Sequence, residues 1–122
     1  NVNTMVTRKP MATQAGYAAS KAALSSVTSH LALELGQYNI RVNSTYMGWM
    51  WGAPVEYYFK QRSKCDDVSV ESLKKDVEKN IPLGRIPTSA ECANAVFFLA
   101  SDLASAMTGA CLDVNGGEYL PR

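Results

Sequence analysis

Hydrophobic residues along the chain alternate between β-like runs and stretches with helical spacing. Three short runs rich in apolar and β-branched residues have the pattern of buried strands, at 1–6, 40–46 and 110–114. Between them, apolar positions recur every three or four residues and predict helices over 15–36, 69–79 and 89–101. Strands that alternate with helices are typical of an α/β fold with a parallel sheet.

Turn and capping residues mark the ends of these elements. Residues 7–14, which contain Lys9-Pro10, are predicted to form a loop, and Gly36 is the candidate C-cap of the first helix. Thr88 and Glu91 have the spacing of a capping box before the last helix. Residues 115–117, Asn-Gly-Gly, predict a turn after the last strand.

The long helix predicted at 15–36 has one face that combines apolar and reactive side chains. At helical spacing this face carries Tyr17, Lys21, Leu24, Thr28, Leu31 and Leu35. His30 points elsewhere, and we interpret it as a structural residue or a subunit contact rather than a catalytic one.

Residues 47–64 are unusually aromatic. This segment carries Trp49, Met50, Trp51, Tyr57, Tyr58 and Phe59, close to Gly48 and Gly52. One interpretation is a segment that only packs into the core. The other is a substrate lid over about 47–80, completed by the charged helix at 69–79, because ligand pockets in α/β folds lie beyond the carboxyl ends of the strands. Under the second interpretation Trp49, Trp51 and Tyr57 form the substrate loop.

Composition and charge exclude several classes of function. The net charge of +1 and the absence of a basic patch with interleaved aromatic residues argue against a nucleic-acid partner. No apolar run has the roughly eighteen residues of a membrane span, so we expect no membrane partner. Cys65, Cys92 and Cys111 are widely spaced and accompanied by one histidine, which predicts reduced thiols in a cytoplasmic protein and no metal site.

Tyr17 and Lys21 form a candidate proton-transfer pair. Their spacing of four residues places a phenol and an ammonium one helical turn apart on the same face. A neighbouring cation favours the phenolate, so Tyr17 is a plausible general acid or base. Thr4 precedes Tyr17 by thirteen residues at the end of a predicted strand and offers a second hydroxyl to the same pocket.

These motifs occur in an order that resembles the C-terminal half of a short-chain dehydrogenase/reductase. The resemblance rests on Thr4, on Tyr17-x-x-x-Lys21, on the segments 39–44 and 108–117, and on Met47-Gly48. It implies that residues 1–122 form the C-terminal part of a single Rossmann-type domain with a doubly wound parallel sheet. The chain holds no Gly-rich turn of the nucleotide-binding type, so we expect the nucleotide-binding half to lie outside it.

The resemblance also implies a role for each residue of the Tyr17 group. Tyr17 matches the tyrosine that protonates the carbonyl oxygen or removes the alcohol proton. Lys21 matches the lysine that binds the nicotinamide ribose, and Thr4 stands where the family normally has a serine that hydrogen-bonds the substrate oxygen.

The loop after the second predicted strand matches the family's cofactor loop with two differences, at Met47 and Gly52. Met47-Gly48 replaces the usual Pro-Gly, and Met50 stands where an aliphatic residue offers its backbone to the cofactor amide. Gly52 stands where a threonine often contacts the cofactor. The implied cofactor is NAD or NADP.

The activity implied by the resemblance is NAD(P)-dependent interconversion of a secondary alcohol and a ketone by hydride transfer. The substrate is a small molecule, either a 3-oxoacyl group or another hydrophobic alcohol or ketone. The family also implies a homodimer or homotetramer. The alternative is a subunit of the same fold that acts as a scaffold or binding module, which is motivated by Thr4 and by Met47 in place of proline.

Overall fold

The computed structural model describes residues 1–121 and contains a three-stranded parallel sheet. The strands are β1 (Val2–Thr4), β2 (Ser44–Met47) and β3 (Cys111–Val114), in the order β1-β2-β3. The α-helices are α1 (Ala15–Leu35), α2 (Ala53–Asp66), α3 (Val70–Glu78) and α4 (Ser89–Ala100). Three short 3-10 turns are η1 (Met5–Thr7), η2 (Gly36–Tyr38) and η3 (Asp102–Ala104). Both the parallel sheet and the alternating order agree with the sequence prediction.

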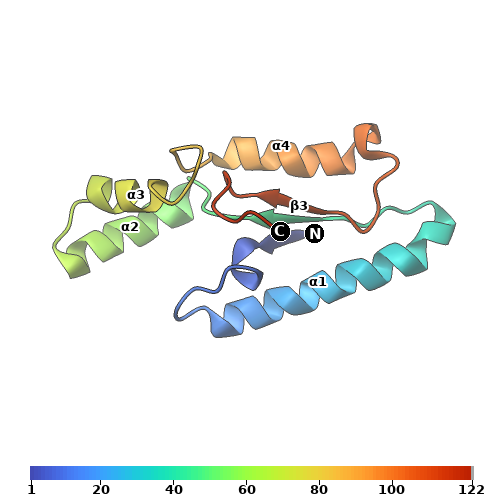
Figure 1. The fold of residues 1–122 in the computed structure, drawn as a ribbon, viewed down its shortest axis with the longest axis horizontal. Coiled ribbons are helices and arrows are strands. Elements are labelled where there is room, and N and C mark those ends of the chain that lie inside the picture. Colours follow the sequence, from blue (N-terminus) through green and yellow to red (C-terminus); the bar gives the residue numbers. More distant parts are fainter. Residues whose placement is uncertain (122) are drawn as a thin grey trace.

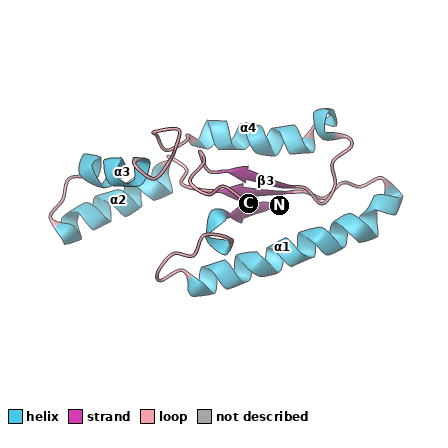
Figure 2. Ribbon diagram, viewed as in Figure 1, coloured by secondary structure: helices cyan, strands magenta, loops and turns pink. Residues whose placement is uncertain are grey.

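The sheet lies between two helices, with α1 on one face and α4 on the other (Figure 1). Successive side chains of β2 point to opposite faces of the sheet. Tyr46 hydrogen-bonds Ser25 of α1, whereas Thr45 lines a cavity with Val96 and Leu99 of α4. The helices α2 and α3 lie beyond the carboxyl ends of the strands (Figure 2). The segment between β2 and α2 therefore begins at the carboxyl ends of the strands, where ligands of α/β folds usually bind.

The strand register brings the three carboxyl ends together. Thr4 pairs with Met47, and Met47 pairs with Val114. The loops that follow these residues therefore begin side by side.

The end of α1 differs in detail from the sequence prediction. Gly36 follows the last residue of the helix, as expected, but it keeps right-handed backbone angles and begins a further 3-10 turn. The left-handed residue is Asn39, with φ of 59°, and its N–H donates to the carbonyl oxygen of Gly36 at 3.0 Å. Asparagine tolerates this conformation better than most residues, so the chain reverses three residues later than glycine alone suggested.

The aromatic segment after β2 contains a helix and a small core of its own. Phe59 and Ile81 are each 2% exposed and form this core with Ile86. Partly buried residues pack around the three, among them Trp49 and Trp51. The packing interpretation of the segment therefore accounts for part of its aromatic content.

The capping box at the start of α4 is present and is reinforced by an ion pair. Thr88 Oγ1 accepts from the N–H of Glu91, and a Glu91 carboxylate oxygen accepts from the N–H of Thr88 at 2.8 Å. Arg85 binds the same carboxylate with two nitrogens. The hydrogen bond from Arg85, followed by those from Thr88, lowers the pKa of Glu91 from 4.5 to about 2.

This lowered pKa predicts how the cap responds to acid. Because the folded-state pKa lies below the ordinary value, the contribution of Glu91 to stability is present above about pH 4.5 and is lost as the pH falls through about 2. We expect a side-chain NMR titration of Glu91 to show a midpoint near 2, and Arg85→Gln to raise it. A wild-type midpoint close to 4.5 would contradict the ion pair in solution.

Candidate functional site

A cavity of about 330 Å³ lies at the carboxyl ends of β1 and β2. Its lining includes Thr4, Tyr17 and Lys21, the three residues predicted to be catalytic. It also includes the predicted cofactor residues Met47, Gly48 and Met50. Residues from two strand ends, one helix and one loop thus meet around a single space, although they lie up to 46 positions apart in the sequence.

Tyr17 and Lys21 lie on the face of α1 that borders this cavity. Lys21 Nζ is 6.0 Å from the centre of the Tyr17 ring and donates to the carbonyl oxygen of Val2 at 3.0 Å. An ammonium has three hydrogens, and within residues 1–121 this is the only hydrogen bond that Lys21 Nζ makes. Lys21 can therefore bind a further acceptor, and Tyr17, which is 47% exposed, is accessible from the cavity.

Thr4 presents a hydroxyl with an uncommitted hydrogen. Its Oγ1 accepts from the N–H of Val6 at 3.4 Å, which caps the η1 turn. Among the described residues Thr4 Oγ1 donates to no other group, so its hydrogen is available to an oxygen in the cavity.

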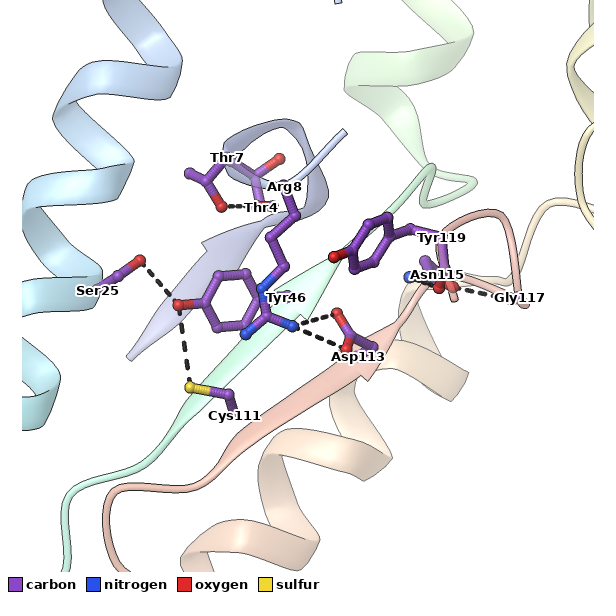
Figure 3. A network of polar contacts seen from close by, with 10 residues as sticks. All are labelled: Thr4, Thr7, Arg8, Ser25, Tyr46, Cys111, Asp113, Asn115, Gly117 and Tyr119. Carbon is purple, nitrogen blue, oxygen red and sulfur yellow. Dashed lines mark hydrogen bonds and ion pairs between the residues drawn. The ribbon is translucent and has the colours of Figure 1, made fainter. Parts of the chain in front are cut away.

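A network of hydrogen bonds attaches α1 to the sheet beside Lys21. Figure 3 shows the hydrogen bond of this network between Tyr46 and Ser25. Tyr46 Oη donates to Ser25 Oγ at 2.8 Å, and Ser25 Oγ donates to the carbonyl oxygen of Lys21 at 3.2 Å. Asn3, which is 2% exposed, donates from Nδ2 to Ser25 Oγ at 2.7 Å and to the Lys21 carbonyl at 3.0 Å. These contacts fix the backbone of Lys21 relative to β1 and β2.

An ion pair covers the strand end of this network. Arg8 Nη1 lies 2.8 Å from both carboxylate oxygens of Asp113, and the Arg8 guanidinium carbon lies 3.6 Å from the centre of the Tyr46 ring (Figure 3). Burial lowers the pKa of Arg8, but the charge of Asp113 and the contact with Tyr46 outweigh burial and raise it overall. Asp113 lies in the family segment 108–117, but neither it nor Arg8 was expected to form an ion pair, because residues 105 positions apart give no sequence signal of their contact.

The three predicted substrate-loop residues have different surroundings. Trp49 lines the cavity, and its ring centre lies 5.6 Å from that of Phe59. Trp51 does not line the cavity: its backbone pairs with Pro87 and Ser89, and Lys74 Nζ lies 4.5 Å from its ring centre. Tyr57 is 65% exposed and also lies outside the lining.

The two glycines of the loop allow close approach of neighbouring segments. A Cβ atom on Gly48 would lie 2.7 Å from Cβ of Asn115, and one on Gly52 would lie 2.6 Å from Oγ of Ser89. Ser89 itself lines the cavity. Gly52 lacks the threonine hydroxyl that the family often has at this position. The hydroxyl of Ser89, at the start of α4, lies in the space that a side chain at position 52 would occupy.

The structure also bears on metal binding and membranes. Within residues 1–121 no three His, Cys, Asp or Glu side chains are grouped so that they could hold a metal ion. The three cysteines are free, and none of the described helices is long and apolar enough to cross a membrane.

Comparison of the chain with known proteins identifies its family. The family model described as Enoyl-(Acyl carrier protein) reductase matches residues 1–118. The chain belongs to the short-chain dehydrogenase/reductase family. This confirms the resemblance drawn from the motifs.

Two curated relatives and one solved structure illustrate the match. The chain is 36% identical to 3-oxoacyl-(acyl-carrier-protein) reductase FabG of Aquifex aeolicus, covering 87% of the chain and 38% of the relative. It is 38% identical to a 3alpha-hydroxysteroid dehydrogenase of Mediterraneibacter gnavus, covering 95% of the chain and 42% of the relative.

The solved structure is an actinorhodin polyketide ketoreductase with NADPH, which aligns with a TM-score of 0.86 and 29% identity over 97% of this chain and 45% of that one. The chain thus spans about 40% of the length of the curated relatives it matches.

Proposed function

We propose that this chain carries the proton-transfer group of an NAD(P)-dependent oxidoreductase that interconverts a secondary alcohol and a ketone. The observation that carries the proposal is the convergence of Thr4, Tyr17 and Lys21 on one cavity at the carboxyl ends of the strands. Membership of the short-chain dehydrogenase/reductase family supports the same activity.

The uncommitted donors around the cavity suit this reaction. In the reductive direction Tyr17 Oη donates a proton to the carbonyl oxygen, and the Thr4 hydroxyl donates a hydrogen bond to the same oxygen. Lys21 Nζ holds the ribose hydroxyls and places its positive charge near the phenol. The nicotinamide, when bound, supplies or accepts the hydride.

The cofactor is NAD or NADP, held by Lys21 together with the backbone from Met47, the last residue of β2, to Met50. Two observations support this assignment: the loop lines the same cavity as Lys21, and a solved relative contains NADPH. Gly48 brings the loop close to Asn115, which keeps the backbone at the end of the sheet.

The substrate is a hydrophobic ketone or alcohol. Apolar side chains that line the cavity support this, among them Met5, Met11 and Val55. One candidate is a 3-oxoacyl group, as in the Aquifex aeolicus relative, and the other is a cyclic alcohol or ketone, as in the 3alpha-hydroxysteroid dehydrogenase.

We further propose a cytoplasmic homodimer or homotetramer. Free thiols favour a reducing compartment. Phe97, 75% exposed on α4, and Leu103, 82% exposed in η3, provide apolar surface that a second copy would bury.

Replacing Lys21 tests the cofactor assignment. In the full-length protein we expect Lys21→Met to raise the dissociation constant for NAD(P)H about 10- to 100-fold, because a hydrogen bond to a charged group contributes about 1.5–3 kcal/mol. Calorimetric titration with each nucleotide measures this. The matched control is Lys60→Met on α2, which is exposed and outside the cavity lining. Equal nucleotide affinity in both variants would remove Lys21 from the cofactor site and favour a scaffold or binding module.

A further inference from the structure

A second cavity of about 310 Å³ adjoins the first. Met11 and Trp49 line both cavities, so the two spaces share a wall. The walls of the second cavity include Phe59 from α2, Val77 from α3 and Glu118 from the segment after β3. The proposed lid helices and the C-terminal segment of the chain therefore enclose a space next to the catalytic residues.

Glu118 is the unusual residue in this cavity. Its side chain is only 7% exposed, and its Oε1 accepts a hydrogen bond from Lys9 Nζ at 2.9 Å. Its Oε2 is buried and has no hydrogen-bond partner among the described residues. Buried carboxylate oxygens are nearly always hydrogen-bonded in folded proteins, so this atom calls for a donor that the described residues do not supply.

The other charged residues of the cavity already have partners. Arg62 Nε binds a carboxylate oxygen of Asp66 at 2.8 Å, and Arg62 Nη1 donates to Tyr58 Oη at 3.0 Å. Asp76 binds Lys79 Nζ at 2.7 Å. Among the lining residues that the structure describes, Glu118 thus provides a buried carboxylate oxygen that is free to accept.

The pairing of Glu118 with Lys9 determines which donor suits the site. Lys9 already balances the negative charge, so a neutral donor satisfies Oε2 without a second cation. The rings of Trp49, Tyr58 and Phe59 around the cavity suit an apolar ligand body. Each carboxylate oxygen has its own acceptor lone pairs, so Oε2 can accept from a ligand while Oε1 keeps its hydrogen bond to Lys9.

We propose that the second cavity is a subsite that binds a hydroxyl group at the far end of a hydrophobic substrate, with Glu118 as the acceptor. The proposal rests on the proposed function, because the substrate carbonyl is placed at Tyr17 and its apolar body passes Trp49. It narrows the substrate class to ketones and alcohols that carry a second hydroxyl remote from the reacting carbon. Glu118 is thereby a specificity-determining residue.

The test compares ligands that differ only at their far end. Alkyl ketones of increasing length are prepared with either a terminal hydroxyl or a terminal methyl group. Their binding to the full-length protein with bound NADP is measured by calorimetry, and their turnover is measured separately. At the length that reaches the second cavity we expect the hydroxyl compound to bind about tenfold more tightly, and Glu118→Met to bring the ratio close to one. The control Glu71→Met, at an exposed position on α3, should keep the tenfold ratio.

The possible results separate this proposal from the proposed function. Equal binding of both series at every length would overturn the subsite and indicate that a water molecule satisfies Glu118. A tenfold ratio that Glu118→Met leaves intact would also overturn it. A ratio that disappears in Glu118→Met, in a protein that turns over no ketone, would support the subsite and contradict the oxidoreductase function. If Glu118→Met does not fold, equal binding of the two series to the wild-type protein still overturns the subsite.

Discussion

Tyr17→Phe should reduce turnover about 10²- to 10⁴-fold while leaving nucleotide binding intact. The substitution removes only the phenolic hydroxyl, and general acid–base catalysis contributes a factor of this size. Tyr17 is 47% exposed at the edge of the cavity, so the loss of its hydroxyl leaves no buried group unpaired. The measurement is steady-state kinetics of the full-length protein with NAD(P)H and a hydrophobic ketone, together with nucleotide titration.

The matched control is Tyr38→Phe. Tyr38 is 67% exposed, lies in η2 and is outside the cavity lining, so its variant should retain wild-type turnover. Turnover of Tyr17→Phe within a few-fold of the control would remove Tyr17 from the mechanism.

Phe59→Ala should lower the free energy of unfolding by about 3–5 kcal/mol, the usual cost of removing a buried aromatic ring. Phe59 is 2% exposed, and its ring centre lies 5.6 Å from those of Trp49 and Tyr58 and 5.9 Å from that of Trp51. The ring therefore joins the loop after β2 to the helix α2. Denaturant unfolding of the full-length protein measures the effect.

Tyr57→Ala is the control for Phe59→Ala, since it removes a ring from the neighbouring, 65% exposed position of the same helix. We expect it to change stability by no more than about 0.5 kcal/mol. Equal and small losses in both variants would mean that the aromatic cluster does not hold α2 to the sheet.

The sequence predicted the parts of the fold that depend on local periodicity. The alternation of β-branched runs with helical spacing predicted the parallel sheet, and the spacing of Thr88 and Glu91 predicted the capping box. The position of Tyr17 and Lys21 on one helix face follows from the helical repeat alone. The position of Thr4 at the end of a predicted strand suggested a second hydroxyl for the same pocket, whereas Met50 required the family resemblance, because nothing local places it at the cavity.

Other features depend on contacts between distant segments and could not be predicted from the sequence. The rings of Trp49 and Trp51 are two residues apart, yet only Trp49 lines the cavity, because Trp51 pairs through its backbone with the segment before α4. Arg8 meets Asp113, and Lys9 meets Glu118, across more than 100 residues. The sequence contains no signal of these pairings, since each charged residue alone resembles a solvated surface residue.

The most direct test of the proposed oxidoreductase activity measures whether the hydride of the cofactor is transferred to a ketone. The full-length protein is incubated with a hydrophobic ketone and NAD(P)H that carries deuterium at the transferring position, and the product alcohol is analysed by mass spectrometry and NMR. We expect deuterium on the carbinol carbon in the wild-type protein and the Tyr38→Phe control, and a rate reduced about 10²- to 10⁴-fold in Tyr17→Phe. Binding of the nucleotide without any transfer of deuterium to a panel of ketones would contradict the proposed activity.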